Sequence, residues 1–185
     1  MTGTGRASAA ERIRLRDGTN AAVRPLLPTD REVVREQYEY LSPESRFHRF
    51  LTGFPHLTET MLDRLVDDVD GVDHVALVLY GLPEDGGEVP AGIARIIRYQ
   101  DRRDTADVAV TVTDQWQGRG VASVLLEALI RRRPEGIRQI VTTVAVDNPA
   151  SLALLRRLGD LTVRPAGDGC LDVVVGLPDL SPSAT

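Results

Sequence analysis

The sequence contains no lysine, so all 22 of its basic residues are arginine. A phosphate-binding P-loop needs a lysine after its glycines, and this class of nucleotide site is therefore excluded. If this protein modifies lysine side chains, it cannot modify its own side chains, because it has no lysine. The single cysteine, Cys170, excludes an internal disulfide and a cysteine-rich metal site. We expect no bound metal.

Long apolar runs and an excess of positive charge are also missing. No run approaches the ~18 apolar residues of a membrane span, and the N-terminus has no apolar signal core. We therefore expect a cytoplasmic protein without membrane contact. The formal net charge of −5 argues against general affinity for nucleic acid, which needs clustered positive charge to displace phosphate counterions.

What is present fits one domain of the α+β class. The 185 residues suffice for one hydrophobic core. The pattern predicts two short strands around Asp17 and Gly18, helices, a strand meander, and then alternating strands and helices around a mixed sheet. We expect the domain over residues 12–176, with flexible ends at 1–11 and 177–185.

Capping residues predict where two of the helices begin. Thr29 or Asp30 precedes the helical pattern of "REVVREQYEYL", and Asp147 or Asn148 precedes that of "PASLALLRRLG". In the strand "TADVAVTV", Val108, Val110 and Val112 alternate with Asp107, Ala109 and Thr111, so the two sets point to opposite faces of the sheet.

The loop "QWQGRG" joins that strand to the helix "VASVLLEALIRRR". Gly118 and Gly120 let the backbone approach a bulky group, and the first N–H groups of the helix have no partner within it. Together with the helix dipole they form an anion site. The loop lacks the third glycine of a dinucleotide fingerprint and follows a meander rather than opening the fold, which excludes that class of site.

These residues resemble the GNAT superfamily of N-acetyltransferases. The family's coenzyme A signature reads Gln or Arg, two free positions, Gly, one free position, then Gly or Ala. The segment from Gln117 to Ala122 matches it, and a second register, Gln115 to Gly120, also fits. The segment "NPASLALLRRLG" resembles the family's second motif, and the likeness covers residues 12–176. It implies a mostly antiparallel central sheet flanked by helices, with strands that splay apart at the coenzyme site.

The resemblance implies acetyl-CoA as cosubstrate. The backbone N–H groups of Gln117, Gly118, Arg119, Gly120, Val121 and Ala122 would hold its pyrophosphate. The backbone of Val110, Thr111 and Val112 would pair with the pantetheine arm, with an N–H around Thr111 facing the thioester oxygen. Asn148 and Ser151 would contact the pantetheine or the adenine side.

Asp107 is the candidate general base for the acceptor amine. The strand around it resembles that of bacterial protein lysine acetyltransferases, which carry a glutamate at this position. A structural or solvated aspartate is the alternative. The segment "LSPESRFHRF" resembles the substrate entrance of the same subgroup, which implies a substrate-side role for Glu44 and His48. A plain amphipathic helix is the alternative there.

Two departures from the family leave its chemistry open. No tyrosine follows Tyr99, although many members use a later tyrosine to protonate the leaving thiolate, and Asp107 is one methylene shorter than the glutamate. An N-acetyltransferase acting on a small-molecule amine or a protein lysine is the first hypothesis. A non-catalytic acyl-CoA-binding sensor is the second. The acceptor, and whether the chain is a monomer or a homodimer, stay open.

Overall fold

The computed structural model describes residues 10–51, 56–84 and 86–179. Most of the two predicted flexible ends lies outside these ranges. The strands are β1 (Glu11–Arg14), β2 (Asn20–Pro25), β3 (His74–Leu82), β4 (Val89–Arg98), β5 (Thr105–Val112), β6 (Gln139–Ala145), β7 (Asp160–Gly167) and β8 (Cys170–Gly176). The longer helices are α1 (Arg31–Glu39), α2 (Pro43–Phe50), α4 (Val121–Arg131) and α5 (Pro149–Arg156). Short helical turns are η1 (Pro28–Asp30), α3 (Glu59–Leu62), η2 (Asp63–Asp67) and η3 (Asp114–Trp116).

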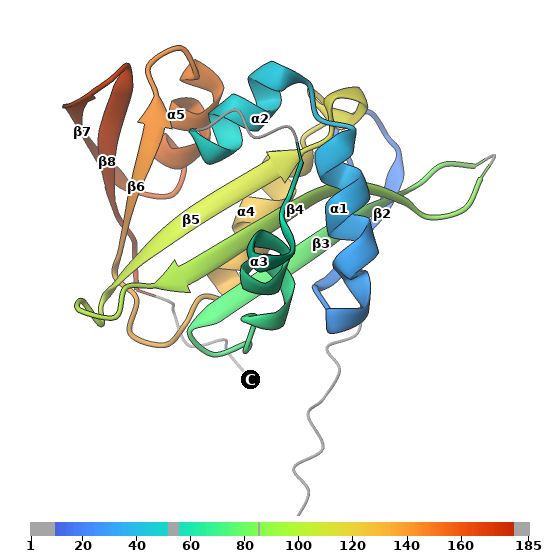
Figure 1. Ribbon diagram of the computed structural model, residues 1–185, viewed down its shortest axis with the longest axis horizontal. Coiled ribbons are helices and arrows are strands. Elements are labelled where there is room, and N and C mark those ends of the chain that lie inside the picture. Colours follow the sequence, from blue (N-terminus) through green and yellow to red (C-terminus); the bar gives the residue numbers. More distant parts are fainter. Residues whose placement is uncertain (1–9, 52–55, 85, 180–185) are drawn as a thin grey trace, which may run out of the picture.

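All eight strands form one sheet in the order β1-β2-β3-β4-β5-β6-β8-β7. Every neighbouring pair is antiparallel except β5 and β6, which run parallel. This confirms the predicted mixed, mostly antiparallel sheet. The parallel pair is held only at Thr105 opposite Gln139 and Ala106 opposite Ile140. Beyond these two positions β5 and β6 diverge, and Figure 1 shows the wedge that opens between them. The predicted splay of strands is confirmed.

Helices cover both faces of the sheet. α4 lies behind the sheet in Figure 1, whereas α1, α2 and α3 lie in front of it. Leu125, Leu126 and Leu129 of α4 are almost fully buried against the rear face, and each such side chain stabilises the fold by about 1.5–3 kcal/mol. On the front face, Val34 and Leu62 belong to a second core cluster.

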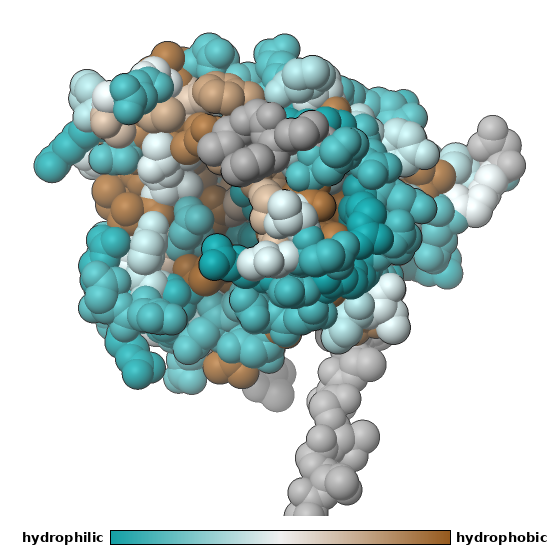
Figure 2. Space-filling view, in the orientation of Figure 1, coloured by the Kyte–Doolittle hydropathy of each residue, from teal (hydrophilic) through white to brown (hydrophobic). Residues whose placement is uncertain are grey.

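The front of the molecule is mainly hydrophilic. Figure 2 shows hydrophobic residues there in small separate patches around the helices. No helix within the described residues combines the length and the apolar character that a membrane crossing requires.

Asp30 directly precedes α1, as one of the two predicted caps, but its carboxylate makes no hydrogen bond to the first turn of that helix. It accepts instead two hydrogen bonds from the Arg24 guanidinium, at 2.7 and 2.8 Å, and one from the Leu27 backbone N–H. A buried bidentate pair with arginine is stronger than a single capping bond, so tertiary structure overrides the local preference.

Candidate functional site

A groove of about 870 Å³ runs between α2 on one side and the β5–α4 loop and α5 on the other. It brings together both predicted substrate-side residues, Glu44 and His48, and every predicted coenzyme-side residue except Arg119. The coenzyme-side residues that line it are Val110, Thr111, Val112, Gln117, Gly118, Gly120, Val121, Ala122, Asn148 and Ser151. Segments more than 100 residues apart in sequence therefore meet in one groove, as the sequence predicts.

The glycine loop has the backbone that an anion site requires. Gly118 and Gly120 adopt positive φ angles of 75° and 90°, a region that side chains disfavour. α4 begins at Val121, directly after Gly120, and no side chain caps its first turn. The N–H groups of that turn have no partner inside the helix and line the groove. The helix start falls within the segment 117–122, which favours the first of the two motif registers.

The side chains of the signature's polar residues are engaged elsewhere. The Arg119 guanidinium lies over the Trp116 ring and 3.3 Å from the carboxylate of Asp17, away from the groove lining. The Gln117 amide donates to the Ser45 hydroxyl at 3.2 Å and to the Asp114 carboxylate at 3.1 Å. Gln117 therefore ties the glycine loop to α2.

The β5 edge that faces the wedge has free backbone groups. The Thr113 N–H donates to the Ala91 carbonyl on the β4 side, and Ile93 lies opposite Thr111 in the same register. Hydrogen-bonded pairs alternate along an antiparallel ladder, so Thr111 pairs with β4, and the N–H and C=O of Val110 face the wedge. The N–H expected around Thr111 for the thioester oxygen is therefore that of the adjacent Val110, and its contact with a thioester stays a prediction.

At its inner end the groove meets a second cavity of about 300 Å³, and Asp107 lines it. The alternation predicted for β5 is observed, because Asp107 lies on the front face while Val108 packs in the rear core. Burial raises the pKa of the Asp107 carboxyl, and this effect outweighs the hydrogen bond from Thr142 and the positive charge of Arg49. Asp107 is therefore a stronger base than an exposed aspartate, as suits a proton acceptor.

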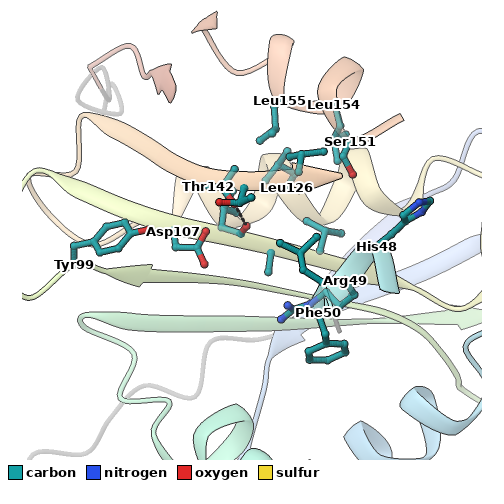
Figure 3. Close-up of a pocket in the computed structure, with 16 residues that line it drawn as sticks. His48, Arg49, Phe50, Tyr99, Asp107, Leu126, Thr142, Ser151, Leu154 and Leu155 are labelled. Atoms are coloured by element: carbon teal, nitrogen blue, oxygen red, sulfur yellow. Dashed lines mark hydrogen bonds between the residues drawn. The ribbon is translucent and has the colours of Figure 1, made fainter. Parts of the chain in front are cut away.

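Three neighbours of Asp107 were missed by sequence reasoning. Figure 3 shows Tyr99 and Thr142 beside it and Arg49 of α2 reaching toward it across the cavity. The Tyr99 hydroxyl donates to the Val141 carbonyl. Burial raises the pKa of Tyr99, and the nearby negative charge of Asp107 raises it further. Arg49 could have been found from the sequence, because it directly follows His48 in the segment that resembles the substrate entrance.

His48 connects the two walls of the groove, whereas Asn148 and Ser151 both belong to the α5 wall. The His48 Nε2 lies 3.1 Å from the Asp147 carboxylate, which joins α2 to the loop before α5. The Asn148 side chain accepts a hydrogen bond from the Ser151 N–H at 3.1 Å and so caps α5. The predicted cap at Asn148 is confirmed, and its contact with a coenzyme stays a prediction.

No cluster of three or more His, Cys, Asp or Glu side chains that could hold a metal ion occurs among the described residues.

Comparison with known proteins points in one direction. A sequence model described as the acetyltransferase (GNAT) family matches residues 35–160. An acetyltransferase of Pseudomonas aeruginosa is 34% identical over 155 residues, which cover 83% of this chain and 82% of that protein. The acetyltransferase Pat of Mycolicibacterium smegmatis is 32% identical over a segment that covers 82% of this chain but only 44% of the length of Pat. The crystal structure of the GNAT domain of S. lividans PAT superposes with a TM-score of 0.76 at 32% identity, covering 91% of this chain and 97% of that domain.

Proposed function

This chain belongs to the GNAT acetyltransferase family, and on that premise we propose that it transfers an acetyl group from acetyl-CoA to an amine, with Asp107 as the general base. The observation that supports this most is the position of Asp107. Its carboxylate lies in a cavity that joins the groove beside the open edge of β5. A base there is close to a thioester laid along that edge.

The groove fits coenzyme A. The two glycines with positive φ would bring the backbone against the pyrophosphate, and a side chain added at Gly118 would meet no protein atom within 4 Å, so the space beside it is open. The N–H groups that begin α4 would donate to the phosphate oxygens. The free N–H and C=O of Val110 and the N–H of Val112 would pair with the amides of the pantetheine arm as an added strand.

The acceptor must attack as a neutral amine, and alkyl amines are mostly protonated at pH 7. Bound acetyl-CoA supplies the thioester: the nitrogen–carbon bond forms, the carbon–sulfur bond breaks, and coenzyme A leaves as the thiolate. Asp107 accepts the proton that the amine loses and passes it to solvent. The Val110 N–H donates to the carbonyl oxygen as negative charge develops there.

The first test measures release of free coenzyme A with a panel of small amines and lysine peptides. We expect Asp107→Asn to lower kcat by about 10²- to 10⁴-fold, the usual contribution of a positioned base, with little change in affinity for the coenzyme. Asp104→Asn is the matched control, because Asp104 lies in the exposed turn before the same strand. Tight coenzyme binding without turnover of any amine would favour a sensor and contradict the enzyme.

A further inference from the structure

One aromatic ring separates the inner cavity from a second hollow on the front of the sheet. Tyr99 lines the inner cavity of about 300 Å³ and also a hollow of about 650 Å³, and it is the only described residue that lines both. The hollow extends from this ring over Ile97 to His74, at the start of β3. Figure 3 shows the ring beside Asp107, at the opposite end of the cavity from His48.

The wedge between β5 and β6 holds the Tyr99 ring in place. The Leu177 N–H donates to the Arg138 carbonyl, and the alternation along β6 therefore turns the Val141 carbonyl toward the wedge. The Tyr99 hydroxyl donates to this carbonyl at 3.2 Å. The Arg102 guanidinium lies 4.6 Å from the centroid of the ring. Tyr99 thus reaches from the end of β4 across β5 to β6 and closes the narrow end of the wedge.

Beyond the ring, the hollow exposes an apolar side chain that a central strand normally buries. Ile97 lies on β4 and is paired with His74 of β3 and Asp107 of β5. Residues paired in this way point to the same face, so Ile97 shares the front face with Asp107. It is 39% exposed, whereas Ile93, on the same face of the same strand, is 7% exposed. A methylene chain that continued past Tyr99 would therefore meet an apolar surface.

The parts of the proposed reaction follow one another along β5. The edge at Val110, where the thioester is expected, lies three residues before Asp107 in the direction of Tyr99, which is roughly 10 Å at about 3.3 Å per residue. The coenzyme occupies the groove on the Val110 side. An amine between the thioester and Asp107 therefore has the rest of its own chain directed toward the Tyr99 ring.

We propose that Tyr99 is a specificity-determining residue whose ring limits the length of the acceptor, so that short primary amines are favoured and longer ones are kept out of the hollow. This inference rests on the proposed function and adds a length limit to it. The ring acts by steric exclusion, and its hydroxyl serves to anchor it on the Val141 carbonyl.

The test measures kcat/KM for the straight-chain primary amines from ethylamine to octylamine. These amines are nearly equal in basicity, so their neutral fractions at one pH are equal and differences in rate report the fit of the chain. In the wild type, kcat/KM should rise by up to about fourfold for each methylene that the cavity buries and fall once the chain meets the ring. Tyr99→Ala should move the maximum to longer chains and raise the ratio of octylamine to butylamine by about tenfold or more, as two further buried methylenes would.

Two further variants and a control make the result specific to the ring. Tyr99→Phe keeps the ring and should keep the wild-type maximum, whereas Tyr99→Leu removes the ring with a smaller loss of packing and should move the maximum as Tyr99→Ala does. Tyr40→Ala is the matched control, because Tyr40 is 70% exposed and lines neither space. A maximum that stays at one chain length in both ring-deleting variants, or one that moves equally in Tyr99→Phe, would overturn the inference.

A binding measurement separates this inference from the proposed function. In calorimetric titration of the protein–coenzyme A complex, the wild type should bind N-octylacetamide no more tightly than N-butylacetamide, and Tyr99→Ala should bind the octyl compound about tenfold more tightly than the butyl compound. This difference without turnover of any amine would refute the enzyme but support the length limit. Turnover of every chain length with no effect of Tyr99 on the preferred length would do the reverse.

Discussion

The outer and inner ends of the groove differ in what they are made of. At the outer end, one continuous segment presents backbone N–H groups at the start of α4, and the signature side chains of Gln117 and Arg119 turn to other partners. At the inner end, side chains from α2, β5, β6 and the end of β4 converge on one cavity. The outer end should tolerate side-chain changes that leave its backbone conformation intact. The inner end should depend on the identity of each side chain.

A change to the backbone at the outer end should have the largest effect on coenzyme binding. Gly120→Val places a branched side chain at a φ of 90°, which such side chains disfavour, so the loop must change the backbone conformation that presents its N–H groups. We expect coenzyme A to bind about 10- to 100-fold more weakly, the equivalent of one lost charge-assisted hydrogen bond. Calorimetric titration with coenzyme A measures this change.

Gly136→Val is the control for that substitution. Gly136 has a similar φ of 82°, but it lies after α4 and outside the groove. Both variants should lose about 1–3 kcal/mol of unfolding free energy from backbone strain, and only Gly120→Val should lose coenzyme affinity. Equal losses of affinity would show that the loop acts through stability alone.

The second prediction concerns the pH dependence of the inner end. Because burial raises the pKa of Asp107 above its ordinary value of 3.8, the base is protonated over a wider acidic range. The acidic limb of kcat, measured with the acceptor saturating so that titration of the free amine does not enter, should therefore rise about tenfold per pH unit up to this raised pKa and then level off. Rates from pH 4 to 8 measure the limb, which should be absent from Asp107→Asn. A limb that persists in the variant would assign the titration to another group.

The same burial has a consequence for stability. The folded state binds the Asp107 proton more tightly than the unfolded state, so the carboxyl stabilises the fold fully below pH 3.8. This contribution is lost as the pH rises through the raised pKa. Urea denaturation at several pH values should show the loss in wild type and a smaller one in Asp107→Asn.

Sequence reasoning recovered the parts of the site that depend on local pattern. The glycines before α4, the Asn148 cap and the alternation that puts Asp107 on the front face each need only a few consecutive residues. It did not recover Arg49, Tyr99 and Thr142, because their meeting depends on how α2 docks and where β6 diverges from β5. The side-chain roles of Asp30 and Gln117 were missed for the same reason, since their partners Arg24 and Ser45 are set by tertiary packing.

The third prediction tests the connection between the two ends. The Asp114 carboxylate accepts from the Ser42 N–H at 3.0 Å and the Ser45 hydroxyl at 2.7 Å, and so fixes the start of α2 against the glycine loop. Asp114→Ala should release α2, which carries Arg49, and lower kcat/KM for the acceptor by about 3- to 10-fold, as expected for one or two lost hydrogen bonds. Steady-state kinetics should show the change mainly in the acceptor KM. Asp101→Ala, at an exposed position, is the control.

The smallest effect is expected at the contact that crosses the groove, between His48 and Asp147. Asp147 is mostly exposed, with 68% of its side-chain surface accessible, so solvent screens the pair and it contributes little stability. Its position matters more, because both residues line the groove from opposite walls and the contact joins α2 to the loop before α5. We expect His48→Ala and Asp147→Ala each to speed coenzyme A dissociation by about two- to threefold, within the range of an exposed ion pair. In stopped-flow measurements the double variant should be no faster than either single variant, because the second substitution removes no further contact between the walls. Additive effects would mean that the two side chains act on the coenzyme separately, and the outer end would then be a side-chain site as well as a backbone site.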